Sequence, residues 1–171
     1  MDDQDIQVFI AGVRRYFESL KADNLVVIEP PFIKDQERPL LQYTGIIEIS
    51  GKARGTVCFT ANQVMLENIL GFLHESPSSG EMLRDLVGEI ANTLSGNARE
   101  EFGKDFLISV PIVISQDQSA FHFPEVGRSY VIPIIWQSEK AYLLVCLYKS
   151  GIDTRTSSGD RDRFAKAPEP V

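Results

Sequence analysis

The segment from Glu81 to Phe102 most constrains how this chain folds, because its apolar and polar residues alternate with the period of an α-helix. Each residue of a helix turns the chain by about 100°. One side of this helix then carries the apolar residues Leu83, Leu86, Val87, Ile90, Ala91, Leu94 and Ala98. The opposite side carries a narrow row made of Asp85, Glu89, Asn92 and Gly96. An amphipathic helix buries its apolar side, so we expect the row to face outward.

The composition of the row favours a binding role over a purely stabilising one. An asparagine inside a helix competes for backbone hydrogen bonds. Gly88 lies beside the row and Gly96 belongs to it. Each glycine lowers the stability of a helix by about 1 kcal/mol relative to alanine. Small residues at these positions would let another molecule approach closely. Polar residues on an exposed helix face are also common without any function, and this simpler interpretation stays open.

Asn97 is interpreted separately because it projects toward the apolar side of the same helix. A buried amide needs hydrogen-bond partners. We therefore expect Asn97 to be a structural residue that fixes a neighbouring loop.

Composition and charge exclude several classes of partner. The 171 residues are 43% hydrophobic and 24% charged, which is typical of a globular domain with its own core. The formal net charge of −7 argues against nucleic acids and anionic membrane surfaces, since both require a basic protein face. The acidic N-terminus does not resemble a signal peptide. No apolar run approaches the ~20 residues that span a bilayer, and we expect a cytoplasmic protein.

The cysteines and histidines predict no metal centre. Cys58 and Cys146 lie in apolar, β-branched runs, and we interpret them as buried residues and not as disulfide partners. His74 and His122 are the only histidines, and no CxxC pair exists. A zinc site is therefore not expected.

The pattern along the chain predicts three helices, at residues 3–21, 61–73 and about 81–102. Strands are expected at residues 25–28, 43–49, 53–60, 106–114, 129–136 and 141–148. Residues 50–52 form a hairpin turn, and Gly103 ends the last helix. Pro111 and Pro133 interrupt two strands, so each should lie at a sheet edge or in a bulge.

This order of elements predicts an α+β protein, a mixed α/β sandwich in which strands pack on two central helices. One long helix, at residues 81–102, would be the functional one. Residues 1–150 are expected to form a single domain. Residues 151–171 are polar and charged, and we expect them to form a disordered tail.

The run Glu89-Ile-Ala-Asn92-Thr-Leu-Ser-Gly96-Asn97-Ala98 resembles the signature helix of the CheX phosphatases, within the CheC/CheX/FliY superfamily. These proteins remove phosphate from the phosphorylated receiver CheY. Their motif is Glu-x-x-Asn, often preceded by Asp or Ser in the place that Asp85 occupies. The resemblance covers roughly residues 1–150. It implies the CheC/CheX fold, one site, and a homodimer formed largely through sheet edges.

The resemblance also implies a role for each residue of the row. Asn92 would hold a water in line with the phosphorus, because its neutral amide can accept from the water and donate to a nearby oxygen. Glu89 would pair with the active-site lysine of the receiver, and Asp85 would extend the docking contact. Gly88 and Gly96 would let the helix lie close to the receiver. The chain itself would bind no metal or cofactor, since Mg²⁺ would come with the CheY-like partner.

Two other functions remain open. A non-catalytic module of the same fold would bind a receiver or a motor component as an adaptor, and phosphate release from a phosphorylated receiver would separate it from a phosphatase. An enzyme acting on a small molecule is disfavoured, because the row is convex whereas small-molecule sites are concave.

Overall fold

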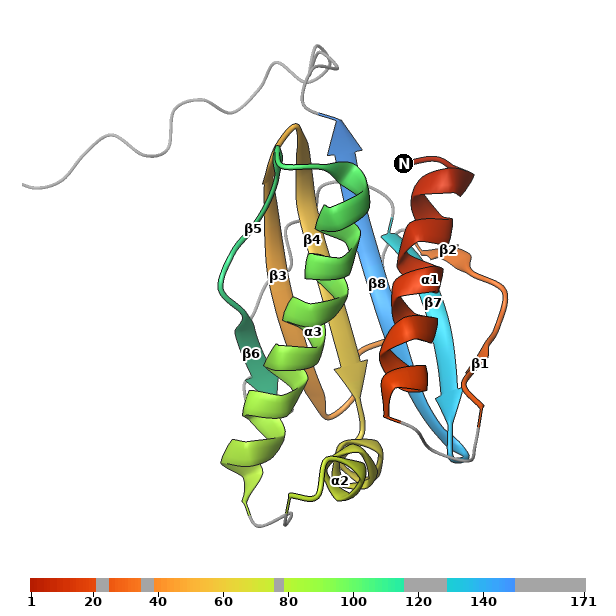
Figure 1. Ribbon diagram of the computed structural model, residues 1–171, viewed down its shortest axis with the longest axis vertical. Coiled ribbons are helices and arrows are strands. Elements are labelled where there is room, and N and C mark those ends of the chain that lie inside the picture. Colours follow the sequence, from red (N-terminus) through yellow and green to blue (C-terminus); the bar gives the residue numbers. More distant parts are fainter. Residues whose placement is uncertain (21–24, 35–38, 76–78, 116–128, 150–171) are drawn as a thin grey trace, which may run out of the picture.

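The computed structural model describes residues 1–20, 25–34, 39–75, 79–115 and 129–149 (Figure 1). Its helices within these ranges are α1 (Asp3–Ser19), α2 (Gln63–Phe72) and α3 (Gly80–Phe102). Its strands there are β1 (Val27–Ile28), β2 (Phe32–Lys34), β3 (Tyr43–Gly51), β4 (Ala53–Ala61), β5 (Phe106–Ile108), β6 (Ile112–Ser115), β7 (Ser129–Trp136) and β8 (Glu139–Lys149). The tail predicted at residues 151–171 lies outside the described residues.

In the described part of the chain, eight strands form one antiparallel sheet in the order β1-β7-β8-β4-β3-β5. β2 also pairs with β7, and β6 also pairs with β3. The expected hairpin joins β3 to β4, and Gly51 adopts the positive φ of 96° that its turn requires. α1 and α3 lie side by side over one face of the sheet, whereas α2 lies at one end (Figure 1).

This architecture confirms the α+β class and refines the expected arrangement of helices. The two helices that cover the sheet are α1 and α3, and not the two consecutive helices in the middle of the chain. α1 can take this place because one side of it is apolar and buried, with Ile6, Phe9, Val13 and Phe17. α2 is only 10 residues long, too short to cross the sheet beside α3.

Side-chain and glycine caps set the ends of the helices. Asp2 and Asp5 form a reciprocal capping box at the start of α1. Asn62 and Ser79 each accept a hydrogen bond from the backbone N–H three residues further on, at the starts of α2 and α3. Gly103 ends α3 at φ 90°, as predicted.

Pro111 and Pro133 lie at positions where the sheet does not need a hydrogen bond from a backbone N–H. The strand expected at residues 106–114 is two strands, β5 and β6, because the chain leaves regular pairing with β3 around Pro111 at the sheet edge. Pro133 lies inside β7. Its carbonyl accepts the N–H of Glu29 on the side of β7 that faces β1 and β2. The nitrogen of Pro133 points to the same side, into the gap between β1 and β2, where no strand needs an N–H from it.

The main core lies between the sheet and the helices, and its large, fully buried side chains include Phe9, Phe59 and Trp136. Cys58 and Cys146 are both buried, as expected. None of the described helices combines the length and apolarity needed to cross a membrane.

Candidate functional site

The rotation of α3 is fixed by its close contact with the sheet at Gly45 of β3. A Cβ at this position would lie 2.4 Å from the carbonyl oxygen of Val87 and 3.0 Å from the Cβ of Ala91. Only glycine therefore lets the strand approach the helix backbone so closely. Because the inner side of α3 is held against the sheet, the direction of its outer residues is also fixed.

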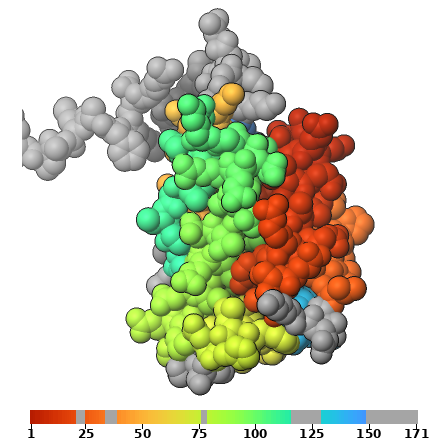
Figure 2. Space-filling model, in the orientation of Figure 1, coloured from red at the N-terminus to blue at the C-terminus, as the bar shows by residue number. Residues whose placement is uncertain are grey.

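The outer side of α3 carries the predicted row, and the row faces outward. Asp85, Glu89 and Asn92 are exposed, and their spacing of four and three residues places them on successive turns. A Cβ on Gly96 would meet no atom within 4 Å, so the space above it is open. Figure 2 shows this helix running along the surface between α1 and the edge strands. No hydrogen bond or ion pair to another described residue holds the three polar side chains.

α1 borders the row on one side. Asn97 of α3 faces Gly12 of α1, where an added Cβ would lie 3.6 Å from the Cβ of Asn97. Tyr16 follows Gly12 by one turn and lies near enough to Glu89 to sense its charge. Burial raises the pKa of the Tyr16 phenol above its usual value, and the negative charge of Glu89 raises it further. Glu89 therefore projects at the junction of the two helices.

The edge strands border the row on the other side, and there the structure corrects a prediction. Gly88 is buried, and a Cβ on it would lie 3.0 Å from Cγ2 of Val113 and 3.3 Å from the Cβ of Pro111. Its small size accommodates neighbours from its own chain and not a partner. The docking role predicted for Gly88 is therefore wrong.

Asn97 contacts a different element from the one predicted. The residue is half-buried at the contact between α1 and α3, beside Gly12. Within the described ranges its side chain has no hydrogen-bond partner that would fix a loop. The helix periodicity correctly placed Asn97 toward the inner side of α3. Its neighbour there is the helix α1 and not a loop.

For two residues, the sequence did not predict that they lie beside the row. Tyr16 and Pro111 lie far from α3 along the chain, and only the packing of α1 and of the sheet edge brings them to it. Pro111 was predicted only as an interruption of a strand, and no motif marks Tyr16. Among the described residues, no group of three or more His, Cys, Asp or Glu is arranged to hold a metal ion.

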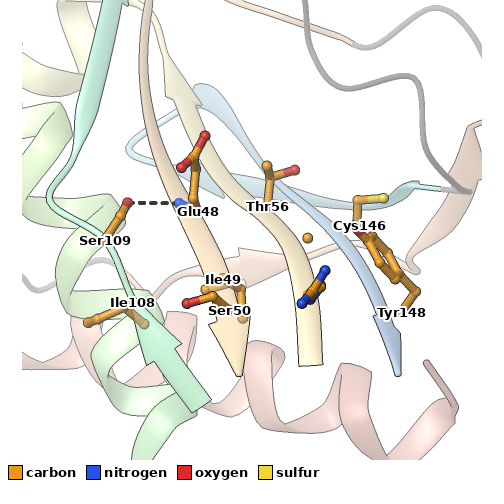
Figure 3. Close-up of a pocket in the computed structure, with 10 residues that line it drawn as sticks. Glu48, Ile49, Ser50, Thr56, Ile108, Ser109, Cys146 and Tyr148 are labelled. Carbon is orange, nitrogen blue, oxygen red and sulfur yellow. Dashed lines mark hydrogen bonds between the residues drawn. The ribbon is translucent and has the colours of Figure 1, made fainter. Parts of the chain in front are cut away.

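A hollow of about 410 Å³ lies elsewhere, over strands β3, β4 and β8 (Figure 3). Glu48, Thr56, Cys146 and Tyr148 line it. Glu48 alternates with Ile47, which packs in the core under the helices, so the hollow opens on the opposite face of the sheet. It is therefore separate from the row on α3.

Comparison with known proteins agrees with this fold. A CheC-like superfamily protein from Shewanella sp. PV-4 is 23% identical, with a TM-score of 0.74 over 86% of this chain and 99% of that one. The chemotaxis protein CheX from Vibrio vulnificus is 25% identical, with a TM-score of 0.72 over 85% and 99%. A chain of the CheX–CheY–BeF3–Mg²⁺ complex from Borrelia burgdorferi is 13% identical, with a TM-score of 0.64 over 84% and 97%. No curated protein gives a significant match.

The fold of this chain is the one found in solved CheX and CheC-like proteins. Residues 43–135, from β3 to β7, match the family model described as chemotaxis phosphatase CheX. The chain belongs to the CheX family.

Proposed function

We propose that this protein hydrolyses the aspartyl phosphate of a CheY-like receiver, with Asn92 and Glu89 as its catalytic residues. The observation that carries the proposal is their arrangement on α3. Both side chains are exposed, one turn apart, on a helix of 23 residues whose inner side is packed against the sheet. Membership of the CheX family supports the reaction, and a related fold occurs in a complex that contains CheY, BeF3 and Mg²⁺.

The two residues have different tasks. Asn92 positions a water in line with the phosphorus, because phosphoryl transfer is accelerated mainly by positioning and electrostatic stabilisation. An amide suits this task since it is neutral and offers both an acceptor and donors. Glu89 pairs with the receiver's active-site lysine and aligns the two proteins.

The remaining partner contacts follow from the same arrangement. Asp85 extends the docking surface by one turn, and the open space over Gly96 lets the receiver approach the helix. Mg²⁺ belongs to the receiver in this proposal, and this chain contributes no metal or cofactor. We further propose that the protein acts in the cytoplasm as a homodimer, in accordance with its family.

Release of inorganic phosphate tests the proposal. A CheY-like receiver is labelled with acetyl phosphate, freed of excess label, and mixed with the wild-type protein, Asn92→Ala or Glu101→Gln. We expect Asn92→Ala to lower the catalysed rate at least about a hundredfold, comparable to loss of one preorganised group in an active site. Glu101→Gln is the matched control, since this exposed carboxylate on α3 lies outside the row.

The outcomes separate the two main functions. Activity of Asn92→Ala equal to the wild type would remove Asn92 from the mechanism. A wild-type protein that binds the receiver activated with BeF3 and Mg²⁺, yet does not accelerate phosphate loss, would be a non-catalytic adaptor.

A further inference from the structure

The edge of the sheet beside α3 exposes two adjacent apolar residues. We call residues 107–112 the edge segment. Val110 is 81% exposed and the adjacent Pro111 is exposed as well, whereas Leu107 and Ile112 face the other side of the sheet. Single exposed apolar residues are normal, but adjacent ones beside a polar site can be part of a contact surface.

The edge segment is held in a defined shape. The Ser109 hydroxyl oxygen accepts the N–H of Glu48 at 3.0 Å (Figure 3). The backbone N–H of Ser109 donates to the carbonyl of Glu48, also at 3.0 Å. The same hydroxyl donates to the carbonyl of Val110 at 2.8 Å. These bonds hold residues 109–111, between β5 and β6, against β3. Val110 is therefore already ordered, and a partner that binds it loses little conformational entropy.

The edge segment is continuous with the row on α3. Pro111 packs directly over Gly88, which immediately precedes Glu89, and Asn92 lies one turn further along. A stable protein partner covers about 800 Å² of each surface, which corresponds to a patch roughly 30 Å across. A receiver centred on Asn92 must therefore also cover the residues that border the row.

The polar row alone would bind a partner weakly, so a stable complex needs apolar contacts beside it. Exposed ion pairs contribute little affinity, and specific interfaces have an apolar centre inside a polar rim. The row itself consists of two carboxylates, an amide and a glycine, and has no apolar side chain. Resting on the proposed function, we infer that Val110 and Pro111 form the apolar part of the surface that docks the phosphorylated receiver.

Binding and turnover of a Val110→Ser variant test this inference. Binding is measured by calorimetry with a CheY-like receiver activated by BeF3 and Mg²⁺, and turnover by phosphate release over a range of receiver concentrations. Loss of a buried valine side chain should raise both Kd and KM about tenfold. The kcat should change less than twofold, because Val110 does not reach the reacting atoms.

Leu25→Ser is the matched control. Leu25 is 83% exposed and precedes β1, at the opposite edge of the sheet. This variant should bind and turn over the receiver like the wild type. Unfolding in urea and light scattering are measured for both variants, so that changes in folding or in subunit association are recognised.

Each result decides between the proposals. Equal Kd values for Val110→Ser, Leu25→Ser and the wild type would overturn the docking role of the edge segment. An unchanged Kd with a lower subunit association would assign the segment to contact between two copies of this chain, which also overturns the inference. Raised Kd without any wild-type turnover would keep the docking surface and refute the phosphatase function. A wild-type protein that does not bind the receiver would refute both.

Discussion

The inner and outer sides of α3 differ in how tightly they are packed and in the polarity of their side chains. The inner side is buried against the sheet, so closely that its backbone nearly touches β3 at Gly45. The outer side places Asp85, Glu89 and Asn92 in solvent, without a hydrogen bond or ion pair to another described residue. The inner side therefore holds the helix in place, and the outer side is left free to contact another protein.

This difference makes stability and activity separable within one helix. Changes under the helix should lower the free energy of unfolding, whereas changes on the outer row should alter the contact with the receiver and leave the fold intact. The following variants are ordered from the largest expected effect on stability to the smallest.

Gly45→Ala should destabilise the protein most. Its Cβ would meet the backbone oxygen of Val87 at 2.4 Å, and a backbone atom cannot turn aside as a side chain can. We expect a loss of about 3 kcal/mol in the free energy of unfolding, at the upper end of the cost of overpacking. Urea unfolding measures it. A variant within 0.5 kcal/mol of the wild type, about the size of an ordinary surface effect, would contradict the close packing of α3 on β3.

Gly88→Ala should have an intermediate effect. The new methyl group would lie 3.0–3.3 Å from side-chain atoms of Val113 and Pro111, which can shift slightly. We expect a loss of about 1 kcal/mol, reduced by the better helix propensity of alanine. Urea unfolding again measures it. A stabilised variant would show that Gly88 has free space, and its predicted docking role would then have to be reconsidered.

Gly96→Ala should change stability in the opposite direction. The space around Gly96 is open, and alanine inside a helix is more favourable by about 0.5–1 kcal/mol. The same methyl group should raise the Kd for a receiver activated by BeF3 and Mg²⁺, since it protrudes into the docking surface. Gly71→Ala in α2 is the matched control, because it also has open space but lies outside the site. Equal receiver binding by both variants would remove Gly96 from the interface.

Tyr16 makes a small, pH-dependent contribution at the border of the row. Its pKa is raised in the folded protein, first by burial and then by Glu89, so the neutral phenol is favoured there. The resulting stability is fully present below the pKa of an unfolded tyrosine, about 10, and is lost as the pH rises above it. Tyr16→Phe should therefore lose less stability than the wild type between pH 9 and about 11. Identical pH profiles for the two proteins, measured by urea unfolding, would contradict the burial of the phenol.

Local patterns in the sequence predicted much of the fold. The periodicity of residues 81–102 gave both the extent of α3 and the outward direction of Glu89 and Asn92, since a helix fixes the angles between its own residues. The hairpin turn, the end of α3 at Gly103 and the burial of the cysteines are likewise local properties.

Contacts between distant segments could not be predicted in this way. The periodicity places Gly88 near the row, but it does not reveal that Pro111 and Val113 cover it. It places Asn97 on the inner side, but not against α1. Which helix lies beside α3 depends on how the strands order themselves in the sheet, and a single sequence does not specify that order.

The most direct test of the central claim is a crystal structure of this protein with a CheY-like receiver activated by BeF3 and Mg²⁺. We predict that α3 lies over the receiver's active site, with the amide of Asn92 within hydrogen-bond distance of a water in line with the beryllium. A receiver bound to another surface, with Asn92 still in solvent, would contradict the account.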